Sequence, residues 1–370
     1  MVLVIDCFKL VRGAGKSIGI YNLALNLVRN LVAERECTND SKIKQCKIVV
    51  LGNIYNEQEF NIAGVEFVRI NHNPLNKIRC IWWELFEVSL VAEKYHADKV
   101  IHPRGYAPIK KTAEEYIIVH DMIPFYYNEH YKGYFNLLEN FYIMWRLKAS
   151  IRSCDGVITI SEASLKDILS RVNISSDKIS VIYNGYNQIG EVPKKKSICD
   201  YMIAVTSGLP HKNAEGIVRA YEAYYKKTDN PLQLYIIGIN DVKQYKLDRC
   251  IETNIMCFKY IESDEEMHQM IADATIFLFL SLIEGFGFPP IEAMQLGTPV
   301  VCSQCSSLPE VVGNAAILVD PTNPEQIADT LIQLQNDEEL QKELVAKGYQ
   351  NITRFSWEKS AAEYAEIVMK

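Results

Sequence analysis

The segment from Glu284 to Glu292 combines residue types that could bind phosphate and hydroxyl groups at one place. It reads Glu-Gly-Phe-Gly-Phe-Pro-Pro-Ile-Glu, so two carboxylates flank two glycines and two prolines. A carboxylate accepts strong, charge-assisted hydrogen bonds from hydroxyl groups. Glycine lets a backbone approach a ligand closely because it has no side chain. The segment therefore predicts a site for a ligand that is rich in hydroxyls.

The elements around this segment would place it at the end of a strand. Residues 275–283 form a short apolar run, and its length is typical of a buried strand. Residues 291–296 indicate a helix, and Pro290 suits its first turn because no N–H is needed there. A helix start offers free N–H groups and a positive dipole end to phosphate. Phosphates between two hydroxyl-rich groups describe a nucleotide sugar, which is the ligand that this segment indicates.

Predicted strands and helices alternate along both halves of the chain, which indicates α/β architecture with parallel sheets. Residues 187–197 are polar, contain glycine, proline and a run of lysines, and are expected to link the two halves. Two Rossmann-like domains follow from this pattern, with ligands bound beyond the carboxyl ends of their strands, in the cleft that separates the domains. Single helices are expected over 82–95 and 131–154. The predicted strands are 2–5, 47–51, 65–70, 99–101, 116–119, 156–160, 179–182, 201–205, 233–237, 255–258, 275–283, 299–302 and 316–319.

Composition sets the class of protein. A chain of 370 residues is long for one core, and 48% hydrophobic and 23% charged residues are typical of a globular protein. The net charge of −7 weighs against nucleic acid as a partner. Of the ten cysteines, Cys302 and Cys305 have the two-residue spacing of a metal-binding pair, but no second cysteine or histidine pair lies near to complete a zinc set. We therefore expect free thiols in a cytoplasmic setting. No apolar stretch reaches the roughly 18 residues of a membrane span.

In these motifs the chain resembles the retaining glycosyltransferase family 4, of GT-B fold. The resemblance covers most of the chain and is strongest over residues 201–321. Glu284 and Glu292 match the family's paired glutamates, and the glycines between them match its Gly-Phe-Gly segment. Further matching segments are Gly297-Thr-Pro-Val300, Leu308-Pro-Glu-Val311 and, more loosely, Ser17-Ile-Gly-Ile-Tyr21, His120-Asp121, Ser161-Glu162 and Asn184-Gly185.

The resemblance implies a role for each residue of the second half that matches. Glu284 would hold hydroxyls of the donor sugar, with a nucleophilic role, as in retaining glycosidases, as the alternative. Glu292 would bind the ribose hydroxyls, and Lys212 would stabilise the departing diphosphate. The remaining donor-binding residues would be Gly15, Ser207, Gly208, Tyr260, Gly285, Phe286, Gly287, Phe288 and Ile291, largely through backbone groups.

One departure concerns the phosphate clamp. Many members carry an arginine about five residues before the lysine, where this chain reads Thr206-Ser207-Gly208. His211 or a cation of the first domain would then have to compensate. Gly15-Lys-Ser17 looks like part of a P-loop, but Leu10 occupies the position of the first glycine, so ATP binding is not expected.

In the first half, the resemblance places His120 near the anomeric carbon as a third catalytic residue. Asp121 would either orient the acceptor or cap the next helix, and Arg104 is assigned to the acceptor side. The aromatic residues at Trp82-Trp83 and between Phe125 and Tyr142 are expected mainly in the core. Stacking on an acceptor sugar, or contact of the first domain with a membrane surface, stays as the alternative.

Taken together, the resemblance implies a hexosyl transfer from a nucleotide diphosphate sugar to a hydroxyl of a polysaccharide or lipid-linked glycan. UDP-glucose or a related UDP-hexose is the first choice of donor and GDP-mannose the second. Residues 1–187 with the final helix 355–370 would bind acceptor, and residues 188–354 would bind donor. No cofactor and no metal ion is expected. The protein would act in the cytoplasm, with the inner face of the cell membrane as the alternative place. A non-catalytic nucleotide-sugar- or glycan-binding subunit and a nucleotide-sugar epimerase are the rival functions.

Overall fold

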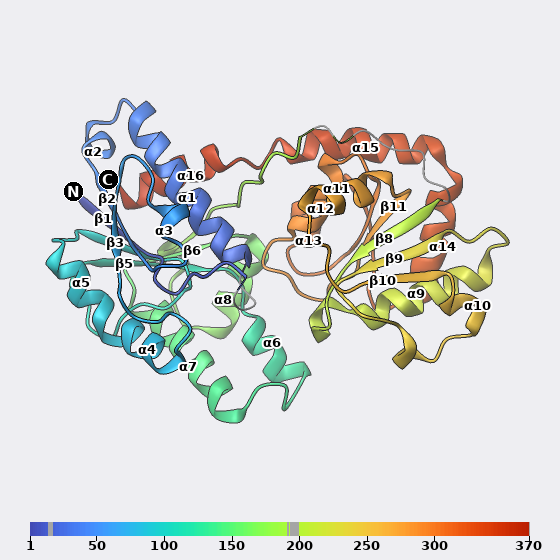
Figure 1. Cartoon of the computed structure of the whole chain (residues 1–370), viewed down its shortest axis with the longest axis horizontal. Coiled ribbons are helices and arrows are strands. Elements are labelled where there is room, and N and C mark those ends of the chain that lie inside the picture. Colours follow the sequence, from blue (N-terminus) through green and yellow to red (C-terminus); the bar gives the residue numbers. More distant parts are fainter. Residues whose placement is uncertain (14–17, 191, 193–199, 370) are drawn as a thin grey trace. The chain divides into compact units, whose positions relative to one another are not determined.

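The computed structural model describes residues 1–370 except 14–17, 191, 193–199 and 370. It divides into two compact units. The first unit contains Met1–Gly185 and Phe355–Lys370, and the second contains Tyr186–Arg354. Each unit is a parallel sheet flanked by helices (Figure 1). None of the described helices is both long and apolar enough to cross a membrane.

The first unit is built on a seven-stranded parallel sheet in the order β3-β2-β1-β4-β5-β6-β7. Its central strands are almost completely buried, because helices cover both faces. The strands are β1 (Val2–Asp6), β2 (Lys47–Gly52), β3 (Val65–Arg69), β4 (Lys99–His102), β5 (Glu114–Val119), β6 (Gly156–Thr159) and β7 (Ile179–Val181).

The helices of the first unit include the last helix of the chain, α16 (Trp357–Val368), which packs against α1 (Ile18–Cys37). The expected return of the final helix to the first unit is therefore observed. The others are α2 (Ser41–Lys44), α3 (Glu57–Phe60), α4 (Lys77–Trp82), a π-helix (Trp83–Glu87), α5 (Val88–Lys94), α6 (Ile123–His130), α7 (Leu137–Ser153), α8 (Glu162–Arg171) and a 3-10 turn (Ser176–Lys178).

The second unit has a six-stranded parallel sheet in the order β10-β9-β8-β11-β12-β13. Its strands are β8 (Tyr201–Val205), β9 (Gln233–Ile237), β10 (Ile255–Phe258), β11 (Ile276–Phe279), β12 (Val300–Ser303) and β13 (Ala316–Val319). Its helices are α9 (Ala214–Lys227), α10 (Arg249–Glu252), α11 (Asp264–Asp273), α12 (Phe288–Gln295), α13 (Leu308–Val312), α14 (Pro324–Asn336) and α15 (Glu338–Ile352), with 3-10 turns at Pro210–Lys212 and Lys243–Tyr245.

The predicted α/β architecture is confirmed, and every predicted strand has a counterpart in one of the two sheets. Ser161 caps α8 as expected, since its side chain accepts a hydrogen bond from the N–H of Ser164. The linker expected over 187–197 falls largely on residues outside the described part of the chain. The expected roles of the two domains in binding donor and acceptor stay predictions.

Three predicted elements differ from the structure. Strand β11 ends at Phe279, although burial continues through Ile283, because loops rather than a sheet neighbour cover the later residues. The single helix expected over 82–95 is split by the π-helix. The helix expected over 131–154 starts only at Leu137, where Asn136 supplies an N-cap, and Tyr131, Tyr134 and Phe135 lie in the loop that follows α6.

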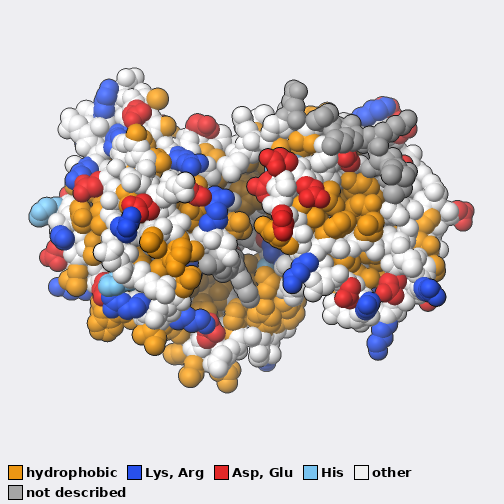
Figure 2. Space-filling model, in the orientation of Figure 1, with side chains coloured by type: hydrophobic (Ala, Val, Ile, Leu, Met, Phe, Trp, Pro, Cys, Tyr) orange, Lys and Arg blue, Asp and Glu red, His pale blue; other side chains and the backbone are white. Residues whose placement is uncertain are grey.

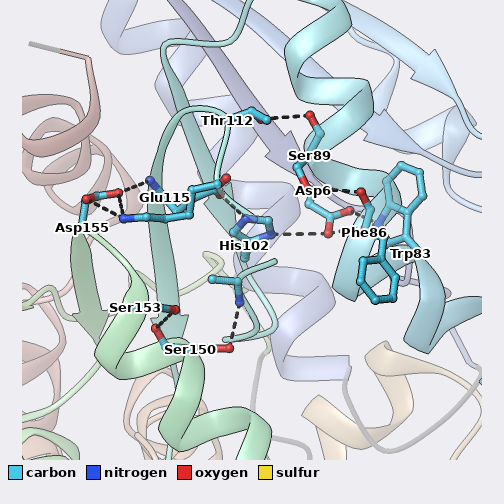
Figure 3. A network of polar contacts seen from close by, with 12 residues as sticks. Asp6, Trp83, Phe86, Ser89, His102, Thr112, Glu115, Ser150, Ser153 and Asp155 are labelled. Carbon is cyan, nitrogen blue, oxygen red and sulfur yellow. Dashed lines mark hydrogen bonds and ion pairs between the residues drawn. The ribbon is translucent and has the colours of Figure 1, made fainter. Parts of the chain in front are cut away.

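A buried polar network links the ends of neighbouring strands in the first unit (Figure 3). His102, at the end of β4, lies with Nε2 2.6 Å from Glu115 Oε2 and Nδ1 3.5 Å from Asp6 Oδ2. The indole N–H of Trp83 donates to Asp6 at 3.1 Å. Burial alone would lower the pKa of His102, but the carboxylates of Asp6 and Glu115 beside the ring raise it to about 9.

We predict that replacing His102 destabilises the first unit more at pH 6 than at pH 9.5. The imidazolium is favoured in the folded state, so its contribution is complete below the unfolded pKa near 6.5 and is lost as the pH rises through about 9. The shift corresponds to roughly 3 kcal/mol at most. All four tryptophans, Trp82, Trp83, Trp145 and Trp357, belong to the first unit, so urea unfolding of His102→Gln followed by tryptophan fluorescence reports on this unit.

The matched control is His130→Gln, on an exposed side chain of α6. This control should change the midpoint of urea unfolding only slightly, and by the same amount at pH 6 and pH 9.5. A loss of stability in His102→Gln that is the same at pH 6 and pH 9.5 would contradict a protonated His102.

Candidate functional site

The candidate site of the second unit lies at the carboxyl ends of β8 and β11. Strand β8 lies between β9 and β11, so the chain order reverses there, and the first residues after these two strands diverge toward opposite sides. Ligands of open α/β sheets bind at such a switch point. Lys212 follows β8, and Glu284 follows β11. Sheet topology thus brings together two residues that are far apart in the sequence.

Lys212 is positioned by a tightly bonded turn between β8 and α9. The hydroxyl of Thr206 donates to the carbonyl of Lys212 at 2.8 Å. Asn213 follows in the left-handed conformation (φ 55°), and its side chain caps α9 by accepting from the N–H of Gly216. The amide of Asn213 also donates to the carbonyl of Leu280, after β11, at 3.0 Å. The turn is therefore fixed to both strands of the switch point.

Glu284 and Lys212 form an ion pair at the centre of the site. Lys212 Nζ lies 2.6 Å from Glu284 Oε1. The side chain of Glu284 is 11% exposed and that of Lys212 is 26% exposed, so a ligand can reach both. The structure thus brings together two of the three predicted catalytic residues.

Two serines hold the backbone that carries Glu284. The N–H of Glu284 donates to Ser306 Oγ at 3.1 Å, and the Ser306 hydroxyl donates to the carbonyl of Glu284 at 2.8 Å. The Ser307 hydroxyl contacts the carbonyls of Glu284 and Phe286 at 3.0 and 2.8 Å. Ser306 itself has a left-handed backbone (φ 58°), which a non-glycine residue adopts at a cost. These contacts replace the sheet ladder that ends at β11.

Gly287 connects this loop to α12 and can only be glycine. Its φ is 114°, and a Cβ would lie 2.6 Å from a methyl of Leu308. Helix α12 begins at Phe288, so the expected start near Ile291 is wrong. The helix start tolerates Pro289 and Pro290 because neither position needs an N–H. Consequently Phe288 supplies a first-turn amide, whereas Ile291 lies further along the helix.

Glu292 lies on α12 and is the most perturbed carboxylate of the site. Burial, together with the negative charge of Asp264, raises the pKa of Glu292 to about 7. No hydrogen bond or ion pair satisfies this carboxylate within the described part of the chain. A partly buried carboxylate without donors is costly in the empty protein, and hydroxyl groups of a ligand would supply the missing donors.

The other predicted donor-binding residues occupy the same edge of the sheet, except one. Ser207 and Gly208 lie in the β8–α9 turn, and a Cβ at Gly208 would face open space, so its backbone is accessible. Tyr260 follows β10 and is 75% exposed. Phe286 is buried and packs on Phe288, with ring centroids 5.2 Å apart, so both rings are packing residues as expected. Gly15 lies outside the described residues.

His211, considered as a substitute for the family's arginine, is 5% exposed. Its carbonyl accepts from the N–H of Leu282 at 2.8 Å, which ties the Lys212 turn to the residues after β11. The His211 ring is thus buried next to Lys212. Which cation takes the place of the family's arginine stays a prediction.

The first unit brings His120, Asp121 and Arg104 together around a small cavity of about 140 Å³. His120 Nε2 lies 2.7 Å from the carbonyl of Pro103, and burial lowers the pKa of His120 to about 4, so the ring is neutral at pH 7. Its backbone carbonyl accepts from the Ser164 hydroxyl at 3.0 Å. Asp121 accepts from the N–H of Ile123, the first residue of α6, at 2.9 Å, and its role toward the acceptor stays a prediction.

Sequence reasoning missed the residues that support the site. Ser306, Ser307 and Asn213 were not singled out, yet they fix the loops of Glu284 and Lys212. A serine pair just before Leu308-Pro309 and an asparagine just before a helix are recognisable as cap positions. The aromatic pair Trp82-Trp83 is divided, with Trp83 1% and Trp82 51% exposed, so only one of the two is in the core.

We predict that Glu292→Gln stabilises the ligand-free protein at pH 8 and that the gain shrinks toward pH 5. An acid whose pKa is higher in the folded than in the unfolded state destabilises the fold when it is ionised. For Glu292 this destabilisation grows as the pH rises from the unfolded pKa near 4.5 to the folded pKa of about 7. After allowance for partial exposure, the gain should be about 1 kcal/mol. Thermal unfolding followed by circular dichroism at both pH values measures it.

Glu284→Gln is the control, because this carboxylate is already paired with Lys212. It should not stabilise the protein at pH 8. A loss of stability in Glu292→Gln at pH 8 would show that protein groups, not a ligand, satisfy Glu292.

Two family models match consecutive parts of the chain. The model described as Glycosyltransferase Family 4 matches residues 42–188, and the one described as Glycosyl transferases group 1 matches residues 189–351. The second match contains Lys212, Glu284 and Glu292, and the first contains His120 and Asp121. The predicted family is thus found in both units.

Relatives and solved structures agree with these matches. O-antigen chain mannosyltransferase RfbU of Salmonella typhimurium is 27% identical over 84% of this chain and 88% of its own length. O-antigen chain mannosyltransferase B of Escherichia coli is 28% identical over 59% of this chain and 61% of its own length.

Among solved structures, sucrose-phosphate synthase from Thermosynechococcus elongatus superimposes with a TM-score of 0.73 at 16% identity, over 99% of this chain and 98% of that chain. WaaG, a glycosyltransferase involved in lipopolysaccharide biosynthesis, gives a TM-score of 0.68 at 11% identity, over 100% of this chain and 99% of that chain. At these identities the likeness concerns the fold. With the two family matches and the paired glutamates, the chain belongs to the family 4 type of glycosyltransferases, with the GT-B fold.

Proposed function

We propose that this glycosyltransferase moves a hexose, with retained anomeric configuration, from a nucleoside diphosphate sugar to a hydroxyl of a glycan. The observation that carries the proposal is the arrangement around the β8–β11 switch point. Lys212 supplies a cation, and Glu284, which pairs with it, supplies a carboxylate that could hold a sugar. Glu292 supplies a second carboxylate, which has no hydrogen-bond donor among the residues that the structure describes. This set matches the diphosphate, the sugar and the ribose of such a donor.

The donor sugar is proposed to be mannose. Two relatives described above are named O-antigen chain mannosyltransferases. This moves GDP-mannose, the second choice from sequence alone, ahead of UDP-glucose. The acceptor is proposed to be a growing surface glycan for the same reason, and the enzyme is proposed to act on the cytoplasmic side of the membrane.

The proposed reaction is a front-face substitution. The bond between the anomeric carbon and the β-phosphate oxygen breaks, and its electron pair stays on that oxygen. The acceptor oxygen bonds to the same face of the sugar, and its proton passes to the departing phosphate oxygen. Lys212 stabilises the charge that develops on the diphosphate, and the amides of Gly287 and Phe288 contact the donor.

Glu284 is proposed to orient the sugar rather than attack it. A carboxylate that is 2.6 Å from an ammonium group is a weaker nucleophile than a free one. When the diphosphate engages Lys212, Glu284 is released to accept hydrogen bonds from the sugar hydroxyls. The proposal needs no divalent ion, because the cationic side chain takes the part of the metal.

The rival functions give different results in one assay. An enzyme of this kind slowly hydrolyses its donor when no acceptor is present, whereas a non-catalytic binding subunit does not. An epimerase would convert the sugar without releasing it from the nucleotide. Purified protein that neither binds nor hydrolyses any nucleotide sugar would refute the proposed function.

We predict that the two glutamates have separable effects. Glu292→Ala should weaken binding of free nucleoside diphosphate by about tenfold, since charge-assisted hydrogen bonds to ribose are lost. Glu284→Ala should keep or slightly raise that affinity, because Lys212 is freed for the diphosphate, but should abolish most transfer. Calorimetry of nucleotide binding and an assay of donor turnover measure the two effects. An equal loss of nucleotide affinity in both variants would contradict the assignment.

We also predict that a calorimetric screen of sugar nucleotides ranks GDP-mannose above UDP-glucose and UDP-galactose. The base and the sugar can be separated by including GDP, UDP and GDP-glucose in the same series. Preference for GDP-mannose over both GDP and GDP-glucose would support a mannose donor. A preference for UDP-sugars would restore the first choice from sequence and reject the mannosyl assignment.

A further inference from the structure

The thiol of Cys305 contacts the backbone that leads from β11 to Glu284. Cys305 lies just after β12 and directly precedes the two serines that hold the Glu284 end of this loop. Its Sγ lies 3.3 Å from the carbonyl oxygen of Leu282 and 3.5 Å from the carbonyl oxygen of Ser281. Three consecutive side chains, a thiol and two hydroxyls, therefore hold the loop from its first residues to its last.

The two carbonyls depend on this thiol. Among the residues that the structure describes, no other hydrogen-bond donor contacts the carbonyl of Ser281 or of Leu282. Ser281 is 1% exposed, so solvent does not reach this part of the loop. A thiol is a weak donor, but a buried carbonyl that loses its donor costs more than the hydrogen bond itself contributed. Removal of the thiol should therefore let the loop move away from its present position.

The same stretch of backbone lies between the two charged residues of the site. The N–H of Leu282 donates to the carbonyl of His211 at 2.8 Å, and His211 directly precedes Lys212. Leu282 itself lies two residues before Glu284. The backbone at Leu282 is thus held by Cys305 on one side and by the Lys212 turn on the other. A shift there would change the separation of Lys212 Nζ and Glu284 Oε1, which is 2.6 Å.

The segment that presents the thiol is fixed to two strands of the sheet. The N–H of Gln304 donates to the carbonyl of Val319, the last residue of β13, at 2.8 Å. The hydroxyl of Ser303 donates to the carbonyl of Phe279, the last residue of β11, at 3.4 Å. Cys305 follows these two residues directly, so the sheet itself sets the position from which its thiol donates.

The surroundings of Cys305 keep the thiol protonated, as a donor must be. Burial raises the pKa of the Cys305 thiol to about 11, and the negative charges of Asp320 and Glu284 also raise it. Figure 2 shows that acidic side chains also gather on the surface of this unit, where Figure 1 draws α11 and α12. The thiol therefore keeps its proton at neutral pH.

We propose that Cys305 is a positioning residue for the transfer reaction, because its thiol fixes the loop that aligns Glu284 with Lys212. The inference rests on the proposed function and adds a residue that the reacting geometry needs. The Lys212 turn has contacts of its own through Thr206 and Asn213, so loss of the thiol displaces Glu284 rather than Lys212. Binding of the nucleotide should therefore persist when the thiol is removed.

The experiment compares Cys305→Ala, which removes the donor, with Cys305→Ser, which keeps one, in the full-length protein with a thiol reductant present. Hydrolysis of GDP-mannose without acceptor should be about fivefold or more slower in Cys305→Ala, whereas calorimetry should show an affinity for GDP within about twofold of the unmodified protein. Cys305→Ser should recover most of the lost rate. Cys257→Ala is the matched control, since it removes another half-buried thiol of the same unit, one that packs against the core, and it should leave the rate unchanged.

A second comparison separates positioning from general damage to the fold. In a Glu284→Ala background, Cys305→Ala should cause no further loss of residual donor hydrolysis, because the residue that the thiol positions is already absent. An additional fivefold loss there, an equal loss in Cys305→Ser and Cys305→Ala, or a parallel loss of GDP affinity would overturn the proposal.

The same assays distinguish this inference from the proposed function. An unmodified protein that hydrolyses donor while Cys305→Ala is equally active refutes only the role of Cys305. An unmodified protein that neither binds nor hydrolyses any nucleotide sugar refutes the proposed function.

Discussion

The hydrogen bonds of Ser306 and Ser307 are the constraint on which the candidate site of the second unit depends. The sheet ladder of β11 ends at Phe279, so the backbone from there to α12 has no strand neighbour to fix it. The two hydroxyls satisfy backbone groups of Glu284 and Phe286 instead. Because the same loop leads directly into α12, these contacts fix both the carboxylate of Glu284 and the direction of the helix that carries Glu292. Ser306 adopts a left-handed backbone to do this, and Asn213 does the same beside Lys212.

The first unit fixes its strand ends in a different way, with buried charges. His102 lies between Glu115 and Asp6, and Asp6 in turn holds the indole of Trp83. In the π-helix, the consecutive residues Trp83 and Glu84 are both buried, so one contacts Asp6 and the other pairs with Lys9. Such helical bulges are frequent at functional sites. The π-helix therefore connects the buried network to a cavity of about 890 Å³ in the first unit, whose lining includes Lys9 and Glu84.

The sequence allowed prediction of the fold and of the candidate residues Lys212 and Glu284 that the second sheet brings together, but not of the residues that hold them in place. Strand positions follow from apolar runs, and the paired glutamates follow from a motif with a clear physical meaning. The early start of α12 and the early end of β11 could not be predicted, because buried loops and buried strands share the same apolar composition. The Lys212–Glu284 ion pair was also missed, since it depends on which strands are neighbours. The π-helix has no simple sequence signature, and an uninterrupted amphipathic pattern gave one helix in its place.

The position of α16 has a consequence for synthesis of the chain. A ribosome releases the residues of the second unit, Tyr186–Arg354, before it releases α16, which packs against α1 near the other end of the chain. The second unit can therefore complete its core during translation, whereas the first unit must keep the apolar face of α1 uncovered until the last residues emerge. The first unit thus begins to emerge before the second unit and finishes folding after it.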